Sequence, residues 1–206
     1  MIFTAIAPAP ANKGKKLPAE PLAPEEVKAL IRSCSTRAAT GVRNRALIVT
    51  LYRAGLRISE ALALYPKDLD PANSTIRVLH GKNDQARTVG LDAGAWAILQ
   101  LWLDRRAALG INGHCRVFST LRGRPVKPAY VRTLLPRLAR KAGIVKRCHA
   151  HGLRHTHAYE LAGEGTPIHL IQAQLGHRNA ATTDRYIRHL CPSEVVEAMK
   201  ARTWSL

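Results

Sequence analysis

Apolar residues recur at helical spacing through most of the chain. In the stretch 23–34, APEEVKALIRSC, a proline and two glutamates precede an apolar face formed by Val27, Leu30, Ile31 and Cys34. The same periodicity predicts further helices over about 43–52, 59–65, 94–109, 128–143, 154–165, 167–177 and 193–206. The pattern therefore predicts a chain dominated by amphipathic helices.

Glycine, serine and proline residues mark the expected ends and a kink of these helices. Gly55 ends the helix that carries Leu47, Ile48 and Leu51 on its inner face, and Ser59 is the expected N-cap of the next helix. The 94–109 helix carries Trp96, Leu99, Trp102 and Leu103 as its buried stripe and ends at Gly110, and the 128–143 helix should be kinked at Pro136.

The period changes from 3.6 to two in the middle of the chain. The stretches STIRVLH (74–80) and ARTVGL (86–91) flank GKND, which predicts a β-hairpin with its turn near 81–84. CRVFST (115–120) has the character of a further short strand. The chain shows no internal repeat, so the expected fold class is mainly α with a small antiparallel β-sheet (α+β).

The N-terminal segment differs in composition from the rest. Residues 1–24 contain five of the twelve prolines together with NKGKK, so 1–22 is expected to be a flexible basic arm. The folded domain is expected over 23–206, with 190–206 as a C-terminal tail. Residues 1–11, MIFTAIAPAPA, lack a basic n-region and a long apolar core, so a secretory signal is not expected.

Net charge points to the partner. Lys and Arg number 32 against 14 Asp and Glu, a formal charge of +18, and a domain this basic repels itself unless it meets a polyanion. Nucleic acid is the favoured partner. An anionic membrane surface is the competing interpretation, but no long apolar span and no lysine tract beside an amphipathic helix supports it.

The apolar content is high enough to build a core without covalent support. Hydrophobic residues make up 46% of the chain, so folding needs no disulfide or metal. The four cysteines, at 34, 115, 148 and 191, form no CxxC pair and are expected to be free thiols in a reducing cytoplasm.

Two basic residues, Arg57 and Lys82, lie at positions where a side chain can contact a bound anion or DNA. Arg57, in AGLRISE, lies among apolar neighbours just before a helix N-terminus, where an anion would also find backbone N–H donors. A salt bridge to Glu60 or Asp68 would equally explain this arginine. Lys82 lies at the expected hairpin tip, where it can either reach into bound DNA or be a solvated turn residue.

The stretch HGLRH, residues 151–155, offers chemistry or metal binding. His151 can act as an acid or a base near neutral pH, while Arg154 can bind a phosphate through its bidentate fork. Cys148, His151 and His155 are also metal-ligand types, but no second defined pair follows and Arg154 would repel a cation.

The remaining histidines and tyrosines have simple structural explanations. His149, His155 and His157 can be satisfied by neighbouring groups in the core or at the surface. The tyrosines at 52, 65, 130 and 159 lie where a helix face or helix end can bury them. His177 can cap a helix end, or donate a hydrogen bond to a phosphate. Tyr186 differs, because Arg185, Arg188 and His189 surround it, and cations favour the phenolate that a nucleophile needs, although a plain surface tyrosine is an equal alternative.

The order of these residues carries more information than any one of them. Arg57 in GLRISE, Lys82 in a hairpin turn, H-x-x-R at 151–154, LGH ending at His177 and then Tyr186 form one ordered set. This set resembles the catalytic domain of the tyrosine recombinases, the phage-integrase family of site-specific DNA recombinases. The likeness runs from LAPEEVKALI to Tyr186, which is most of the chain.

The resemblance implies a mechanism without metal, nucleotide or other cofactor, in which a tyrosine attacks a phosphodiester and leaves a 3′-phosphotyrosyl bond and a 5′-hydroxyl. The implied roles are nucleophile for Tyr186, charge neutralisation for Arg57 and Arg154, a phosphate hydrogen bond for His177, general acid for Lys82 and proton acceptor for His151. It also implies a homo-oligomer on DNA, a tetramer in synapsis, with the 190–206 tail packing on a neighbouring subunit, and a cytoplasmic location at the nucleoid.

Two features depart from the family pattern. Larger relatives carry an N-terminal helical domain that closes around DNA, whereas only about 24 arm-like residues precede the catalytic part here, as in the short fimbrial phase-switch enzymes or in a fragment. The hairpin reads GKND where relatives often have a second glycine after the lysine. The alternatives are a DNA-binding regulator with the same fold, a topoisomerase-like relaxing enzyme and a metal-dependent nuclease, although carboxylates are scarce near the motifs.

Overall fold

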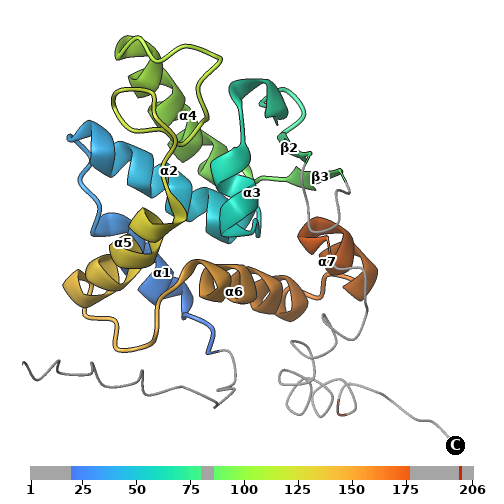
Figure 1. Ribbon diagram of the computed structural model, residues 1–206. Coiled ribbons are helices and arrows are strands. Elements are labelled where there is room, and N and C mark those ends of the chain that lie inside the picture. Colours follow the sequence, from blue (N-terminus) through green and yellow to red (C-terminus); the bar gives the residue numbers. More distant parts are fainter. Residues whose placement is uncertain (1–19, 80–85, 177–199, 201–206) are drawn as a thin grey trace, which may run out of the picture.

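The computed structural model describes residues 20–79, 86–176 and 200. The elements run in the order α1 (Pro24–Arg32), α2 (Ala39–Arg53), α3 (Ile58–Ala63), the 3-10 helix η1 (Pro66–Asp68), β1 (Leu69–Asp70), β2 (Thr75–Val78), β3 (Arg87–Gly90), α4 (Ala93–Ala108), α5 (Pro128–Lys141), α6 (Ala150–Gly163) and α7 (Ile168–Leu175). The helices form the body of the molecule, and a small sheet lies at one end of it (Figure 1). The predicted α+β class is confirmed.

Helix α2 is the centre of the core and packs against both α4 and α6. Its predicted inner face is confirmed, because Leu47, Ile48 and Leu51 have no exposed surface. From α4, Trp102 is fully buried and donates its indole N–H to the Val117 carbonyl at 2.8 Å. Burying such large side chains is the main favourable contribution to folding, and it fixes the helices that carry the site.

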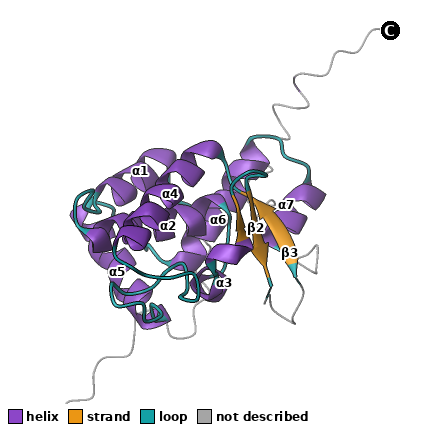
Figure 2. Ribbon diagram, turned by 90° about the horizontal axis from the view of Figure 1, so that it is seen from above, coloured by secondary structure: helices purple, strands orange, loops and turns teal. Residues whose placement is uncertain are grey.

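The sheet has three antiparallel strands in the order β1-β2-β3. The predicted hairpin is its β2–β3 pair, with Thr75 opposite Gly90 and Val78 opposite Arg87, and β1 is an addition too short to leave a periodic signal. In Figure 2 the sheet and α7 lie together at one end of the helical body, where α7 contacts β3. The predicted strand at 115–120 is represented by an isolated bridge between Ser119 and Pro125.

The predicted starts of three helices are wrong. Helix α2 begins at Ala39 rather than near Arg43. Helix α3 begins at Ile58, so Arg57 rather than Ser59 is the N-cap residue, and the Glu60 carboxylate accepts the Arg57 backbone N–H at 2.9 Å. Helix α6 begins at Ala150 rather than near Arg154. A histidine caps it, because Nδ1 of His149 accepts the Gly152 N–H at 3.0 Å.

Most of the predicted N-terminal arm lies outside the described residues, and so does the 190–206 tail apart from residue 200. At the end of the arm Leu22 is buried and donates its backbone N–H to Oγ1 of Thr156 at 3.0 Å. Lys146 bonds both the Pro21 carbonyl and the Glu26 carboxylate, which attaches the start of α1 to the loop before α6. Among the described helices none is long and apolar enough to cross a membrane.

Candidate functional site

The site is built around a tight turn between α2 and α3. Gly55 has φ +61°, a conformation that costs little only for glycine. A Cβ atom there would also lie 2.6 Å from Cδ2 of His157 and 2.8 Å from Cδ2 of Leu175. This close approach of α6 and α7 to the turn requires glycine, and the turn delivers Arg57 to the start of α3.

Arg154 comes from α6 and is almost completely buried, with 2% of its surface exposed. Its Nη1 donates to the Gly55 carbonyl at 2.6 Å, and its Nη2 donates to the Leu175 carbonyl at 2.5 Å. A buried guanidinium needs such partners, since an unpaired buried charge is very costly. Arg154 therefore joins the α2–α3 turn to the end of α7.

The C-terminal end of α7 collects three arginines. Each arginine donates to one carbonyl of the last turn. Arg87 Nε donates to the Gln174 carbonyl at 3.3 Å, Arg154 Nη2 donates to the Leu175 carbonyl at 2.5 Å, and Arg57 Nη2 donates to the Gly176 carbonyl at 3.4 Å. The last carbonyls of a helix have no partner within it and carry a partial negative charge, so cationic donors stabilise them. Gly176, with φ +65°, ends the helix in the left-handed conformation.

Glu60 pairs with two of these arginines from a position with 1% exposure. It contacts Arg57 at 2.6 Å and Arg87 at 2.8 and 3.1 Å. Burial acts to raise the pKa of this carboxyl. The hydrogen bond and the charge of Arg87, together with the backbone and side-chain hydrogen bonds from Arg57, outweigh burial and lower the pKa. Glu60 is therefore ionised at neutral pH and fixes both guanidinium groups.

His151 lies in the first turn of α6, one turn before Arg154. Its side chain reaches the surface, and its ring lies 4.0 Å from the ring of His155 and 6.5 Å from that of His149, centre to centre. Its pKa is lowered, first by partial loss of water around the ring and then by the charge of Arg154. A neutral imidazole at neutral pH can accept a proton.

Three of the six predicted site residues are described, and the structure brings two of them to one place. Arg57 and Arg154 both bond the end of α7, and His151 shares α6 with Arg154. Lys82, which falls between β2 and β3 in the sequence, His177, which follows Gly176, and Tyr186 lie outside the described residues. The salt bridge from Arg57 to Glu60 that the sequence also predicted is present.

Arg87 and Gln174 belong to the site but were not among the residues predicted from the sequence. Arg87 lies opposite Val78 and two residues before Val89, so it belongs to the buried face of its strand. A cation at such a position indicates a buried ion pair, and that alternation was the available signal. No comparable signal marks Gln174, because its partners come from β3 and from the end of α2.

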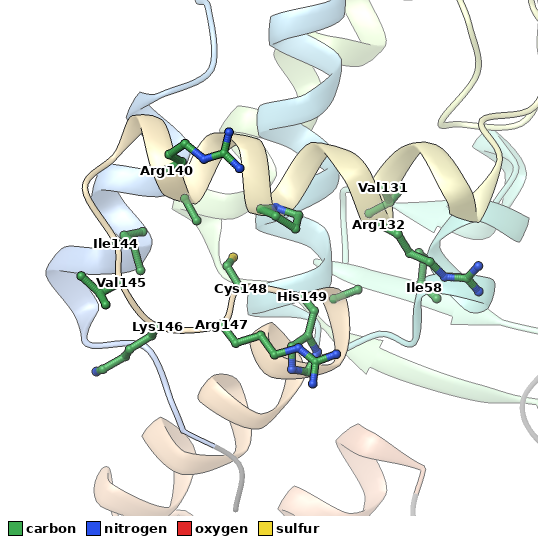
Figure 3. Close-up of a pocket in the computed structure, with 13 residues that line it drawn as sticks. Ile58, Val131, Arg132, Arg140, Ile144, Val145, Lys146, Arg147, Cys148 and His149 are labelled. Atoms are coloured by element: carbon green, nitrogen blue, oxygen red, sulfur yellow. The ribbon is translucent and has the colours of Figure 1, made fainter. Parts of the chain in front are cut away.

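A cation-lined cavity of about 470 Å³ adjoins the site. Figure 3 shows Arg132 and Arg140 extending from α5, with Lys146 and Arg147 in the loop before α6. Apolar residues complete the lining, among them Ile58 of α3, next to Arg57. Arg132, Arg140 and Arg147 are exposed, and their side chains make no hydrogen bond or ion pair within the described part of the chain.

The described histidines and cysteines do not form a metal site. Over residues 20–79 and 86–176, no three His, Cys, Asp or Glu side chains are grouped to hold an ion. Burial, followed by the charge of Glu26, raises the pKa of the Cys148 thiol to about 11, which disfavours the thiolate that binds metals. His149 caps α6 and His155 is buried, which agrees with their structural interpretation, whereas His157 is buried but neither of its ring nitrogens has a hydrogen-bond partner among the described residues. The expected burial of Tyr159 is wrong, since 43% of it is exposed.

Known proteins match the chain in sequence and in structure. Residues 20–191 match the model of the phage integrase family. Tyrosine recombinase XerC of Bacillus pumilus is 36% identical over 167 residues, covering 79% of this chain and 54% of XerC. Tyrosine recombinase XerD of Ralstonia nicotianae is 34% identical over 167 residues, covering 80% and 54%. The chain thus spans about half the length of these curated relatives.

Solved structures agree. The crystal structure of XerA recombinase superposes with a TM-score of 0.77 at 30% identity, over 90% of this chain and 66% of XerA. That of XerH site-specific recombinase bound to palindromic difH substrate, a post-cleavage complex, superposes with a TM-score of 0.74 at 30% identity, over 89% and 53%. With a family match over most of its length, a shared fold and two arginines gathered at the end of α7, this chain belongs to the phage integrase family and has the tyrosine recombinase catalytic-domain fold.

Proposed function

We propose that the chain is the catalytic domain of a site-specific recombinase that cuts and rejoins DNA strands through a 3′-phosphotyrosyl intermediate. The observation that carries the proposal is the meeting of Arg57 and Arg154, from distant parts of the sequence, at the end of α7. The relatives named tyrosine recombinase and the XerH complex with its difH substrate support it.

In the proposed cutting step, the phenol oxygen of Tyr186 attacks a scissile phosphorus and the bond from phosphorus to the 5′-oxygen breaks. His151 accepts the phenol proton, and Lys82 protonates the departing 5′-oxygen. A 5′-hydroxyl from a partner strand then reverses the step, so the energy of the phosphodiester stays in the covalent intermediate. No external energy source is needed.

The arginines act on the charge that develops during this reaction. Arg57 and Arg154 neutralise the non-bridging oxygens, and His177 adds a hydrogen bond to them. Phosphoryl transfer depends mainly on correctly placed positive charge, and fixed donors contribute more than mobile ones because they need no reorganisation. Glu60 and the α7 carbonyls supply that fixation, since they bond the guanidinium groups in the absence of DNA.

Double-stranded DNA is the proposed partner, bound by a homo-oligomer that becomes a tetramer in synapsis. The exposed arginines of the cavity beside the site, Arg132, Arg140 and Arg147, are proposed to contact the phosphate backbone on either side of the cut. The 190–206 tail is proposed to join subunits. The protein would act in the cytoplasm, at the nucleoid.

The experiment uses a pool of nicked duplexes with randomised sequence, incubated with the protein in EDTA. Cutting next to the nick releases a short fragment with a 5′-hydroxyl, so the protein stays covalently attached to DNA. We expect an adduct on a denaturing gel that is absent with Tyr186→Phe, and sequencing the trapped DNA identifies the site. DNA binding without any adduct supports the regulator instead, and an adduct that persists in Tyr186→Phe assigns the nucleophile to another residue.

A further inference from the structure

Arg87 is a charged residue on the buried face of a strand. In β3 it alternates with Val89, and in the register it is paired with Val78, so it shares the face of the sheet that carries the buried apolar residues. Only 13% of its side chain is exposed. A guanidinium in this position destabilises the fold unless all of its donors find acceptors.

Each of the three guanidinium nitrogens of Arg87 has an acceptor, and two residues supply these acceptors. Nη1 and Nη2 donate to the two oxygens of Glu60 at 3.1 and 2.8 Å, and Nε donates to the Gln174 carbonyl at 3.3 Å. Glu60 also bonds Arg57 at 2.6 Å, so the two arginines share one carboxylate. This planar, bidentate arrangement is specific to arginine, because a lysine ammonium cannot bond both oxygens and the carbonyl with the same geometry.

A second contact joins the same strand to the same helix end. The Gly90 N–H donates to Oε1 of Gln174 at 3.0 Å, and Nε2 of Gln174 donates to the Gly90 carbonyl at 2.9 Å. The Gln174 amide thus pairs with the β3 edge much as a neighbouring strand would. A Cβ atom on Gly176 would lie 2.8–3.0 Å from three side-chain atoms of Arg87, so the guanidinium lies directly against the end of α7.

We propose that Arg87 is a positioning residue for strand cleavage, which acts without touching DNA by holding Arg57, through Glu60, and the last turn of α7 in one fixed arrangement. The proposal rests on the proposed recombinase function. Because Arg57 and Arg154 both bond the end of α7, a shift of that end moves both phosphate-binding groups together. Misplacement of about 1 Å is enough to slow a positioned reaction by about 100-fold.

The fold supplies a matched control in Arg106. It is also buried, with 5% exposure, and its Nη2 donates to the carbonyls of Asn112, Cys115 and Arg116. None of these acceptors belongs to α3, α6 or α7, so Arg106 stabilises α4 and the loop that follows it. Loss of Arg106 thus removes a buried arginine that bonds no residue of the candidate site.

The test compares Arg87→Met, Arg87→Lys and Arg106→Met in the full chain, using a nicked duplex selected with the wild-type protein. At saturating protein we expect single-turnover cleavage by Arg87→Met to fall about 100-fold, while its DNA dissociation constant changes less than about threefold. Arg87→Lys should be intermediate, because it keeps the charge but loses the fork. Arg106→Met should cut within about threefold of wild type, even where its melting temperature falls.

The pH profile separates positioning from general stability. The charged groups facing Glu60 are Arg57, at the start of α3, and Arg87, on β3. Without Arg87 the pKa of Glu60 rises, so this carboxylate becomes protonated at a higher pH and releases Arg57 there. We expect the acid limb of the cleavage profile to move to higher pH in Arg87→Met and to stay in place in Arg106→Met.

Each outcome decides one question. If the wild-type protein cuts the duplex and Arg87→Met cuts it at the same rate, the role proposed for Arg87 is wrong, while the proposed function stands. Equal losses in Arg87→Met and Arg106→Met, with unshifted acid limbs, would reduce Arg87 to a structural residue. No adduct from wild type on the random pool would overturn the proposed function, and this proposal with it. If circular dichroism shows that Arg87→Met is unfolded, the cleavage rate of Arg87→Lys is used instead. Cleavage by Arg87→Lys at the wild-type rate would then overturn the proposal.

Discussion

Two groups of arginines in this protein are held in different ways. At the end of α7, Arg57, Arg87 and Arg154 bond a buried carboxylate and three consecutive carbonyls. In the neighbouring cavity, the exposed arginines of α5 and of the loop before α6 make no such bonds within the described residues. We call these the fixed arginines and the surface arginines, the latter being Arg132, Arg140 and Arg147.

The difference shows what each group can contribute. A fixed guanidinium has already lost its rotamer freedom and is already oriented, so it can stabilise charge in a transition state without reorganising. A surface arginine loses that freedom only on binding, and it suits a phosphate backbone whose exact position varies. The fixed group is therefore expected to determine the rate of cleavage, and the surface group the affinity for DNA.

The largest expected effect tests the fixed group directly. Arg154→Lys keeps the charge but cannot bond the carbonyls of Gly55 and Leu175 through one planar fork. Single-turnover cleavage should fall about 1,000-fold, as for loss of a transition-state donor. Arg147→Lys in the surface group is the matched control and should cut at nearly the wild-type rate. Similar rates for the two variants would break the distinction between the groups.

The second effect concerns the turn that delivers Arg57. Gly55→Ala places a Cβ at φ +61° and within 2.6 Å of His157, so we expect a loss of about 3 kcal/mol in the free energy of unfolding. Gly110→Ala has the same type of backbone, φ +71°, but meets no atom within 4 Å, and should lose about 1 kcal/mol. Urea unfolding measures both, and equal losses would show that the turn tolerates a side chain.

The third expected effect is a loss of folding stability at acid pH, caused by protonation of the buried His157. His157 is buried, and neither ring nitrogen has a hydrogen-bond partner among the described residues. Burial and then the charges of Arg53 and Arg154, opposed by Asp92, lower its pKa to about 4. The unfolded chain binds the proton near the ordinary value, so stability is complete at pH 7 and declines as the pH falls toward about 4.

The measurement is the free energy of unfolding at pH 6 and at pH 5, in wild type and in His157→Gln. We expect His157 to contribute up to about 1.4 kcal/mol to the loss over this unit of pH, and the variant to lack that contribution. His114→Gln, in an exposed loop, is the control and should keep the wild-type slope. A wild-type slope in His157→Gln would show that other groups cause the acid sensitivity.

The smallest effect belongs to the surface group. Arg132→Ala and Arg147→Ala should each weaken DNA binding by less than about tenfold and reduce the slope of log affinity against log salt by about one. Cleavage of bound DNA should keep its wild-type rate. A slower cleavage step at saturating protein would instead place these side chains among the groups that act on the reacting phosphate.

Sequence alone located the parts of this arrangement that depend on local pattern. Arg57, at a helix start, and Arg154, one turn after His151, were found because residue order and helical spacing are visible along the chain. The helix faces were predicted for the same reason, since burying apolar surface is a periodic requirement. The hairpin was also predicted, but not the strand register that places Arg87 on the buried face.

Two kinds of feature were missed: helix caps for which local signals compete, and contacts between distant parts of the chain. The Glu60 carboxylate and not the Ser59 hydroxyl bonds the start of α3, and His149 caps α6, because the competing local signals were equally plausible. Gln174 has partners at the end of α2 and on β3, and no spacing rule connects such distant positions. The catalytic roles of all six site residues stay predictions, and Lys82, His177 and Tyr186 also lie outside the described residues.

The most direct test of the central claim removes the charge from the phosphate instead of the protein. A methylphosphonate at the scissile position replaces one negatively charged oxygen with a neutral methyl group, so the substrate no longer needs an arginine there. Arg154→Ala is expected to be inactive on the normal duplex and to regain cleavage on this substrate, while Tyr186→Phe should be inactive on both. If Arg154→Ala stays inactive on the methylphosphonate duplex while wild type cuts it, the fixed arginines do not neutralise the scissile phosphate and the account is wrong.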